Sequence, residues 1–326
     1  DPLWSRGLGD VYKRQELWSK VKMKKMIILV LMFMSLMLIL IGCSHSKQQT
    51  QKKDYKPEVL NVEFVPSQHS ETLNAKVKPL QKLLSKELGI PVKVHISTNY
   101  NTMVEALKSK KVDVAFISPV SYTIAHDQGA ADVLLKSKGY LVDKEGNKTK
   151  KLVDYYRSQI VVKKDSDIKD LKDLKHKKVG LQDVESTSGY IYPLASLKDK
   201  GISLNDIHTK QIKGYDQALI ALLNNDVDAV ATYQDARADL KKDYPQIYQD
   251  TKVIYRSDKI PNDTISTRSD MSPSWKDKIS NAFMHISETH KGKKVISEIY
   301  GHEGYEKAHD KDFDKVREYR QKIDSN

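Results

Sequence analysis

The chain has 326 residues, of which 39% are hydrophobic and 30% charged. This is an ordinary globular composition, and the chain is long enough for two domains. Its formal charge of +12 indicates an anionic environment, such as a membrane surface, a cell-wall polymer or nucleic acid. The basic residues are spread along Lys-rich faces, without a long basic block or an interleaved aromatic motif, and this pattern argues against a nucleic-acid partner.

The first predicted element is a targeting segment that begins at Met23. Two lysines follow, and residues 26–41 then form an apolar run of about 16 residues, typical of a signal peptide and at the short limit for a spanning helix. The run ends in Leu-Ile-Gly-Cys, which resembles a bacterial lipobox whose cysteine, Cys43, is lipidated. A plain membrane anchor is the alternative. Cys43 is the only cysteine, so it cannot pair within the chain, and its position favours lipidation.

The N-terminal part is therefore expected to divide into three pieces. Residues 1–22 precede the signal and have no place in it, so we expect them to be spurious upstream translation or added sequence. Residues 23–42 are the expected signal peptide, and 43–56 a flexible lipidated tether. We expect the protein to be held on the extracytoplasmic face of the cell membrane through Cys43, in a bacterium with one membrane.

Short apolar runs alternate with amphipathic segments in the next part of the chain. Leucines and a valine fall on one stripe of the first helix, which Gly89 ends as a C-cap, and Pro119 begins the third helix. Repeated strand–helix–strand units indicate a mainly parallel sheet with helices on both faces. The expected strands are 59–66, 92–98 and 112–118, and the expected helices 71–89, 100–111 and 119–128.

A second set of the same units follows, so we expect two similar lobes. The stretches "ALKSKKVDVAFISPVSY" and "ALLNNDVDAVATYQDAR" share a helix end, a strand and polar residues at the strand's carboxyl end. The expected strands are 178–182, 207–212 and 227–234, with helices from 186, over 215–226 and over 235–245. The tail is expected to carry two short strands from residue 251, helices over 272–290 and 291–300, and a solvated charged C-terminal helix.

The expected fold is an α/β clamshell with two hinge crossovers. Its first lobe is expected to comprise residues 57–157, its second 158–255, and residues 256–326 to return to the first. In such a topology the ligand lies where the strand ends of both lobes face the cleft.

Three consecutive hydroxyl side chains, Ser186, Thr187 and Ser188, follow a predicted strand and open a predicted helix. Such oxygens cap free N–H groups, and Gly189 allows close backbone approach. A helix N-terminus also accepts an anion readily, because its N–H donors are unpaired and its potential is positive. We interpret the three hydroxyls as a cradle for a tetrahedral oxyanion such as phosphate, phosphonate or sulfate. The alternative is a helix cap in a solvated turn.

Five stretches resemble the phosphate/phosphite/phosphonate-binding proteins of ABC importers, and they occur in that family's order over residues 58 to 315. They are "FVPSQHSETLNAKVKPLQKLLSKELGIPVKV", "DVAFISPVSYTIAHDQGAADVLL", "QDVESTSGYIYPLASLK", "GYDQALIALLNNDVDAVATYQDAR" and "KIPNDTISTRSDM". The resemblance implies a type II periplasmic-binding-protein-like fold. It also implies a lipoprotein that captures a phosphonate, phosphite or phosphate anion in the cleft and delivers it to an ABC permease and its ATPase.

The resemblance also implies which residues contact the ligand. The hydroxyls at 186–188 match the family's oxyanion cradle. Tyr100, which opens a helix, and Tyr122, in "SPVSY", match aromatics that wall the pocket and can donate a phenolic hydrogen bond. Tyr215 lies where many members carry a histidine, and a neutral tyrosine cannot supply an imidazolium charge. This departure leaves open which oxyanion is preferred.

Two carboxylates, Asp235 in "QDAR" and Asp263 in "PNDT", match acidic residues that line the family's cleft. A carboxylate beside a bound anion can accept a hydrogen bond from a protonated P–OH, which selects against sulfate. It can also pair with an ammonium on an aminoalkylphosphonate. The alternatives are ordinary: Asp235 can cap the helix 235–245, and Asp263 can be a turn residue.

Other kinds of site have little support in the sequence. There is no His-Glu-x-x-His, paired cysteine, Gly-x-Ser-x-Gly or P-loop, so we expect no metal, no cofactor and no enzyme. An enzyme on the same scaffold would need a nucleophile or cofactor-linking residue in the cleft, whereas Cys43 lies at the lipobox. A sensing or adhesive lipoprotein that binds a protein partner is the other alternative. We expect a monomer.

Overall fold

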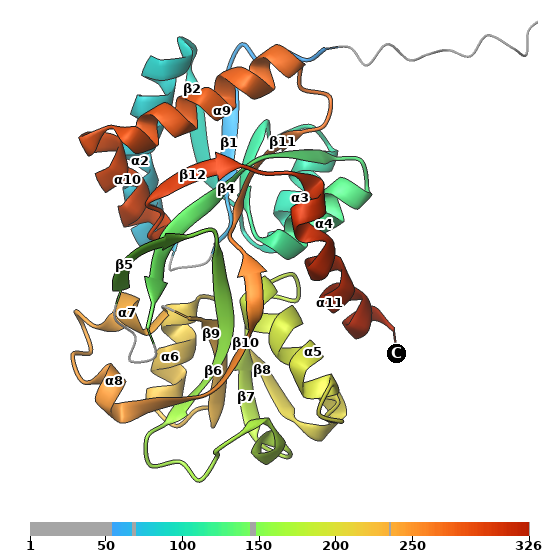
Figure 1. Cartoon of the computed structure of the whole chain (residues 1–326), viewed down its shortest axis with the longest axis vertical. Coiled ribbons are helices and arrows are strands. Elements are labelled where there is room, and N and C mark those ends of the chain that lie inside the picture. The colour runs from blue at the N-terminus through green and yellow to red at the C-terminus, as the bar shows by residue number, and fades with distance from the viewer. Residues whose placement is uncertain (1–53, 67–69, 144–147, 235, 326) are drawn as a thin grey trace, which may run out of the picture. The chain divides into compact units, whose positions relative to one another are not determined.

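A computed structural model describes residues 54–66, 70–143, 148–234 and 236–325, and Asp54–Asn326 form one compact unit. The expected signal peptide, Cys43 and most of the tether lie outside the described residues. Among the helices that are described, none is both long and apolar enough to cross a membrane. The described residues build two sheets flanked by helices (Figure 1).

The first sheet, with the helices packed on it, is called lobe 1. Its strand order is β12-β4-β11-β3-β1-β2, and β5 pairs with β4. Helices α2, α9 and α10 pack on one face, and α3 and α4 on the other (Figure 1). The elements are β1 (Leu60–Phe64), α2 (Ser70–Leu88), β2 (Val92–Ile96), α3 (Tyr100–Lys108), β3 (Val114–Ile117), α4 (Pro119–Asp127), β4 (Ala131–Val142), β5 (Lys148–Val153), β11 (Thr264–Arg268), α9 (Pro273–Glu288), α10 (His290–Tyr300) and β12 (Gly304–Lys307).

The second sheet, with its own helices, is called lobe 2, and its strand order is β10-β6-β9-β7-β8. One face is covered by α5 and the other by α6, α7 and α8. The elements are β6 (Tyr155–Lys163), β7 (Lys178–Leu181), the π-helical turn η2 (Thr187–Ile191), α5 (Tyr192–Lys198), β8 (His208–Gln211), α6 (Tyr215–Leu223), β9 (Ala229–Tyr233), α7 (Ala236–Leu240), α8 (Ile247–Asp250) and β10 (Thr251–Pro261).

The α/β clamshell class is confirmed, and the helix boundaries follow the expected capping chemistry. Residues of the α2 stripe such as Leu73 and Leu84 are fully buried, at 0% exposure, so this apolar face holds the helix to its sheet. Gly89 adopts φ +69°, the left-handed conformation of a C-cap glycine. Ser118 caps α4 by accepting from the N–H of Ser121, directly before Pro119.

Both sheets are mixed rather than mainly parallel. In each, a parallel core of β2-β1-β3 or β8-β7-β9 is extended by antiparallel strands. The antiparallel strands include β4, β5, β6, β10 and β11, which lie beside the two places where the chain changes lobe. A chain that leaves one lobe and later returns through the same region must run in both directions in that region, so some of its strands are antiparallel. The repeated strand–helix units of the sequence do not indicate these antiparallel strands.

The chain passes from lobe 1 to lobe 2 at Asp154 and returns at residues 262–263. The expected lobe boundaries, 157/158 and 255/256, lie inside β6 and β10, because both strands continue up to the hinge. The backbone N–H of Asn262 donates to the carbonyl of Asp154 at 3.0 Å. Its side-chain amide donates to the carbonyl of Val153 at 3.3 Å, so one residue ties the two crossovers together.

The C-terminal segment is less solvated than expected. It forms the turn η4 (Asp310–Phe313) and the helix α11 (Asp314–Asp324). Phe313 and Val316 are fully buried, and Tyr319 is also buried, at 8% exposure. Figure 1 shows α11 running from beside α4 of lobe 1 toward α5 of lobe 2, and it packs against both helices.

Candidate functional site

A cavity of about 170 Å³ lies between the two lobes. It is lined from lobe 1 by residues such as Tyr100 and Ser118 and from lobe 2 by residues such as Thr187 and Tyr215. Since a buried water needs about 10–15 Å³ by this kind of measure, the cavity has room for a small polyatomic anion with an organic substituent. Residues of the hinge, including Asn262 and Asp263, form part of its wall.

The expected oxyanion cradle is one wall of this cavity. Thr187 and Ser188 line it and open η2, while Ser186 caps that turn by accepting from the N–H of Gly189 at 3.2 Å. As the first residues of a helical turn, Thr187 and Ser188 have N–H groups with no partner in the preceding turn. Gly189 is required sterically, because a Cβ there would lie 2.3 Å from Cγ of Gln182.

The hydroxyl of Tyr215 joins the outer two hydroxyls of the cradle. Its oxygen lies 2.8 Å from Oγ of Ser186 and 2.9 Å from Oγ of Ser188. Each of these two contacts uses one of the three hydroxyl protons, and Ser188 also hydrogen-bonds to Tyr156. Tyr215 therefore orients the serines as well as lining the cavity. Burial raises its pKa to about 12, so it stays a neutral donor at physiological pH.

Thr187 also forms the contact that brings the lobes together at the cradle. Its Oγ1 accepts a hydrogen bond from the backbone N–H of Val120, near the start of α4, at 3.0 Å. Beside it, the hydroxyl of Ser118 donates to the carbonyl of Glu185 at 3.2 Å, and that of Ser121 donates to Glu185 Oε2 at 3.3 Å. The N-terminal ends of α4 and η2 thus face each other across the lobe boundary, and the Thr187 hydroxyl proton is still available to an anion.

Tyrosines supply much of the remaining polar surface of the cavity. Burial raises the pKa of Tyr100 and Tyr156 well above the ordinary value, and nearby Asp263 adds to both shifts. Both side chains are therefore neutral phenols that can donate to an anion. Seven tyrosines line the cavity: Tyr100, Tyr140, Tyr155, Tyr156, Tyr215, Tyr233 and Tyr300.

Apart from these tyrosines, the described titratable residues that line the cavity are Asp239, Asp263, His302, Lys138 and Lys148. Burial raises the pKa of Asp263 to about 7, so this carboxyl holds a proton for part of the time near neutral pH. Burial also lowers the pKa of His302 to about 4, which leaves its imidazole neutral. The cationic lining residues are Lys138 and Lys148, and Lys138 pairs with Glu306 at 3.1 Å. Among the described lining residues there is no arginine, so recognition near the cradle relies on neutral donors.

The expected site residues do not all come together. Tyr100, Thr187, Ser188, Tyr215 and Asp263 line the cavity, and Ser186 is bonded to Tyr215 behind them. Asp235 lies outside the described residues.

Tyr122 is the expected wall residue that does not line the cavity. It is fully buried between α4 and the C-terminal segment, with its ring 4.8 Å from that of Phe313. Its hydroxyl donates to Asp310 Oδ1 at 2.9 Å. The side chain therefore faces the packed side of α4, and it is Ser118 that faces the cavity.

Sequence reasoning did not identify several residues of the cavity wall. Tyr155 and Tyr156 come from the first crossover, where the adjacent pair in "VDYYRSQ" was a usable signal. Asn262 and Ser118 are neighbours of motifs that were recognised. Lys138, Lys148 and His302 had no local signal. Over the described residues, no three His, Cys, Asp or Glu side chains gather as metal ligands would.

Comparisons with known proteins point to one family. A sequence model of the family described as "ABC transporter, phosphonate, periplasmic substrate-binding protein" matches residues 62–313. The chain is 29% identical over 259 residues to the phosphate-import protein PhnD of Mycolicibacterium smegmatis, which covers 74% of this chain and 76% of that protein. It is 27% identical over 265 residues to the phosphonates-binding periplasmic protein of Escherichia coli K12, and the match covers 80% of this chain and 73% of that protein.

Solved structures show the same fold. The structure of PhnD1 from Prochlorococcus marinus in complex with methylphosphonate matches with a TM-score of 0.71 and 18% identity, over 83% of this chain and 100% of that one. A binding protein of an ABC phosphonate transporter from Pseudomonas aeruginosa matches with a TM-score of 0.70 and 22% identity, over 81% and 86%.

Proposed function

Because the chain belongs to the family of periplasmic substrate-binding proteins of phosphonate ABC transporters, we propose that it captures a phosphorus oxyanion between its lobes and delivers it to an importer. Members of this family are binding components of transporters rather than enzymes. The finer parts of the proposal are a phosphonate, phosphite or phosphate ligand, release to a permease with its ATPase, and action as a monomer.

The observation that carries the proposal is the pairing of donors and an acceptor in one interlobe cavity. Thr187 and Ser188 present N–H and hydroxyl donors at the start of η2, and Tyr100 adds a phenol from lobe 1. Asp263 supplies a carboxyl that can accept from a P–OH. A tetrahedral oxyanion that carries a proton matches both halves of this arrangement, whereas an anion without a proton matches Asp263 only when that carboxyl is itself protonated.

Closure follows from the same contacts. An anion held by η2 of lobe 2 and by lobe 1 side chains contacts both lobes at once, so its binding energy favours the closed arrangement. We further propose that Cys43 is lipidated and keeps the protein on the extracytoplasmic face of the membrane, where a receptor for an importer must act.

Thr187→Ala tests the cradle. Losing one hydrogen bond to a charged ligand costs about 1.5–3 kcal/mol, which corresponds to roughly ten- to a hundred-fold in affinity. Ligand at about 100 times its dissociation constant should stabilise the wild-type chain by about 2.7 kcal/mol. At the same concentration Thr187→Ala should lose about 1.3–2.3 kcal/mol of that increment, measured as melting temperature with phosphite, methylphosphonate, aminoethylphosphonate, phosphate or sulfate.

Thr187→Ser is the matched control, because it keeps the hydroxyl that accepts from Val120 and donates to the ligand. We expect it to bind nearly as well as the wild type. A plain helix cap would instead lower stability by about 1 kcal/mol with or without ligand. Equal losses in both states, or no wild-type shift with any of the five anions, would contradict the proposal.

A further inference from the structure

The C-terminal helix α11 contacts the two helical segments whose N-terminal ends meet at the cradle. One is α4 of lobe 1, and the other is the continuous segment η2–α5 of lobe 2. We propose that α11 is a brace that sets how the two halves of the oxyanion site face each other, with Tyr319 as a positioning residue acting through Tyr192. The identity of the ligand in this inference rests on the proposed function; the brace itself does not.

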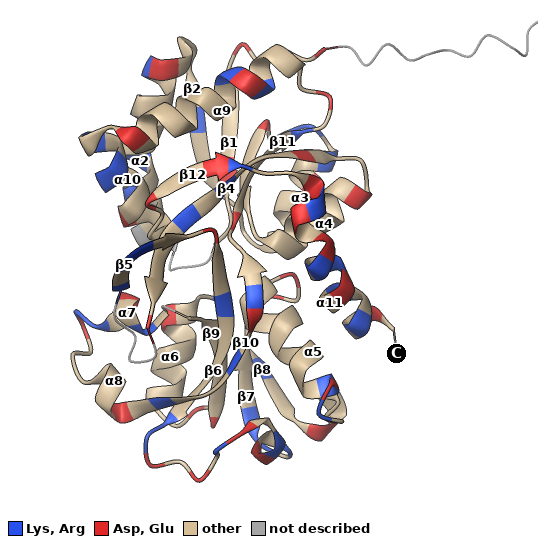
Figure 2. Ribbon diagram, viewed as in Figure 1, with Lys and Arg blue, Asp and Glu red and all other residues tan. Residues whose placement is uncertain are grey.

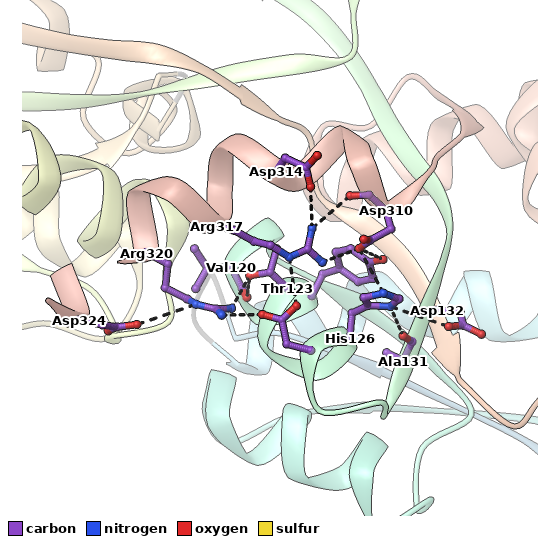
Figure 3. Close-up of polar contacts among 12 residues, drawn as sticks. Val120, Thr123, His126, Ala131, Asp132, Asp310, Asp314, Arg317, Arg320 and Asp324 are labelled. Carbon is purple, nitrogen blue, oxygen red and sulfur yellow. Dashed lines mark hydrogen bonds and ion pairs between the residues drawn. The ribbon is translucent and has the colours of Figure 1, made fainter. Parts of the chain in front are cut away.

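On the lobe 1 side, α11 is held by two arginines. Arg320 Nη2 donates to Asp127 Oδ2 at 2.6 Å, and its Nη1 donates to Oγ1 of Thr123 at 2.8 Å. Arg317 Nε donates to the other oxygen of Asp127 at 3.1 Å, and its Nη2 donates to Asp310 Oδ1 at 2.5 Å. Figure 3 shows both guanidinium groups reaching from α11 toward α4 and η4.

The arginine side chains in this first contact are mostly shielded from solvent, whereas their partners Asp127 and Asp310 are 37% and 41% exposed. The exposed fractions of Arg317 and Arg320 are only 17% and 19%, and Asp127 uses both of its carboxylate oxygens. Hydrogen bonds between ions that are partly buried are stronger than those on an open surface. The lobe 1 end of α11 is therefore firmly placed.

On the lobe 2 side, the main contact is a pair of stacked rings. The centroids of Tyr192, the first residue of α5, and Tyr319 lie 4.0 Å apart, with an interplanar angle of 10°. Both residues belong to one apolar cluster that also contains Ile191 from η2 and Phe313 and Val316 from the C-terminal segment. This cluster continues across the lobe boundary, so α11 and lobe 2 share a core.

The charged contacts at this end are weaker than the stack. Lys322 pairs with Asp199 at 2.9 Å, but the two side chains are 43% and 51% exposed. Figure 2 shows Lys, Arg, Asp and Glu together along α11. Since exposed pairs contribute little, the apolar contacts, which include the Tyr192–Tyr319 stack and Ile323 packed against the lobe 2 core, couple α11 to lobe 2.

The geometry links this stack directly to the cradle. Tyr192 follows Ile191, the last residue of η2, so a shift of Tyr192 moves the turn that begins with Thr187. On the other side, Thr123 belongs to the same helix as Val120, whose N–H donates to Thr187. Tyr319 and Arg320, neighbours on α11, thus hold the two helices that meet at Thr187.

The test compares dissociation rates and lobe movement in the detergent-solubilised full chain, with methylphosphonate and inorganic phosphate as probes. Tyr319→Ala should raise the dissociation rate of the bound probe by roughly two- to tenfold, which is the fold-change that corresponds to the interaction energy of one aromatic pair. The association rate should be nearly unchanged. Tyr319→Phe should restore the wild-type rate, because it keeps the ring and loses only the hydrogen bond to Asp258. Gln321→Ala, at an exposed position of the same helix, is the control and should change neither rate.

A second measurement does not depend on the ligand. Dyes on cysteines replacing Lys93 of β2 and Lys210 of β8, in a Cys43→Ser background, report the distance between lobes by energy transfer. Both lysines are exposed and lie on strands at the edges of the two sheets. Without ligand, Tyr319→Ala should broaden the distribution of distances relative to the wild type, and Tyr319→Phe should not.

Arg320→Gln provides the same test from the lobe 1 end if Tyr319→Ala fails to fold, and it should shift both readouts in the same direction. An unchanged dissociation rate together with an unchanged distance distribution would overturn the brace. So would a loss of melting temperature in Tyr319→Ala with no change in either readout. If the wild type binds neither probe, the proposed ligand class is wrong, and the distance distribution alone then decides the brace.

Discussion

The carboxyl of Asp263 and a phosphorus oxyanion can hold one proton between them. A protonated Asp263 beside a dianion and an ionised Asp263 beside a monoanion contain the same number of protons, so the complex is one titrating unit. Burial, which raises the pKa of Asp263 to about 7, places this shared proton in the physiological range. Sulfate brings no proton near neutral pH, so it must use the one on Asp263.

Affinity should therefore fall as pH rises above 7. Once free Asp263 and the free ligand have both lost their protons, the complex must take one up, and the dissociation constant should rise about tenfold per pH unit. Titration calorimetry with methylphosphonate from pH 6 to 9 measures this slope. Asp263→Asn should flatten it and should relax the discrimination against sulfate.

An affinity that rises with pH, rather than falls, would indicate a different role for Asp263. If Asp263 pairs with an ammonium on the ligand, aminoethylphosphonate should bind more tightly as pH rises through 7, because the carboxyl then ionises. A slope that persists unchanged in Asp263→Asn would remove Asp263 from both roles.

At the scale of elements, Glu185 lies where the start of η2 meets the start of α4. It is 9% exposed and accepts from Ser121 across the lobe boundary. Burial raises its pKa from 4.5 to about 7; Asp183 and Glu105 add to the shift, while the Ser121 hydrogen bond and Arg320 oppose it. This carboxyl is therefore more easily ionised in the unfolded chain than in the folded one.

The consequence for stability has a clear sign. The folded chain binds the Glu185 proton more tightly than the unfolded chain does. Glu185 therefore leaves the free energy of unfolding unchanged below about pH 4.5 and lowers it progressively as pH rises from 4.5 to 7. Above pH 7 the loss of stability stays constant. A shift from 4.5 to about 7 corresponds to about 3 kcal/mol. Glu185→Gln should raise the free energy of unfolding at pH 8 by up to that amount and leave it nearly unchanged at pH 4.5, measured by urea denaturation. Equal effects at both pH values would contradict this account.

The elements differ in how far the sequence could predict them. Strand β3 is buried on both faces and reads as an apolar run, β1 alternates buried apolar residues with the half-buried Asn61 and Glu63, and α2 shows its stripe. By contrast β4, which passes the hinge, carries Lys136, whose Nζ binds Asp154 at 2.7 Å. Lysines that form hinge contacts or line the cavity interrupt the run of apolar residues by which a strand is predicted from sequence. For this reason the sequence predicts no strand at β4 or β5.

The candidate site could be predicted where one local segment supplies its chemistry. Ser186, Thr187 and Ser188 combine hydroxyls, a following glycine and a helix start, and the turn lines the cavity as expected. The position of Tyr122 could not be predicted in this way. One face of α4 meets the cavity and the other packs against α11, and the local sequence does not show which face is which. Tyr156 and Tyr300 reach the cavity from distant parts of the chain, and only the three-dimensional fold brings them there.

At the scale of the whole molecule, the proposed anchor is a single residue. Cys43→Ala should abolish retention in the membrane fraction, because one lipidated cysteine is the only attachment proposed and acyl chains supply its affinity. Cell fractionation with an antibody to the protein measures the distribution, and binding of methylphosphonate by the released protein shows that it is still folded. A variant that remains fully in the membrane fraction would contradict the lipoprotein proposal.

The insertion of lobe 2 into lobe 1 also fixes an order of assembly during synthesis. All strands of lobe 2 lie between residues 155 and 261, so its sheet can form from one continuous length of chain. Lobe 1 has β11 between β3 and β4, and Thr264 pairs with Ile117, which was synthesised long before it. The lobe that is begun first must therefore be finished last, through contacts of long sequence separation that form slowly. Asp263 and α11 belong to that late segment, so a nascent chain has a complete second lobe before it has an anion site.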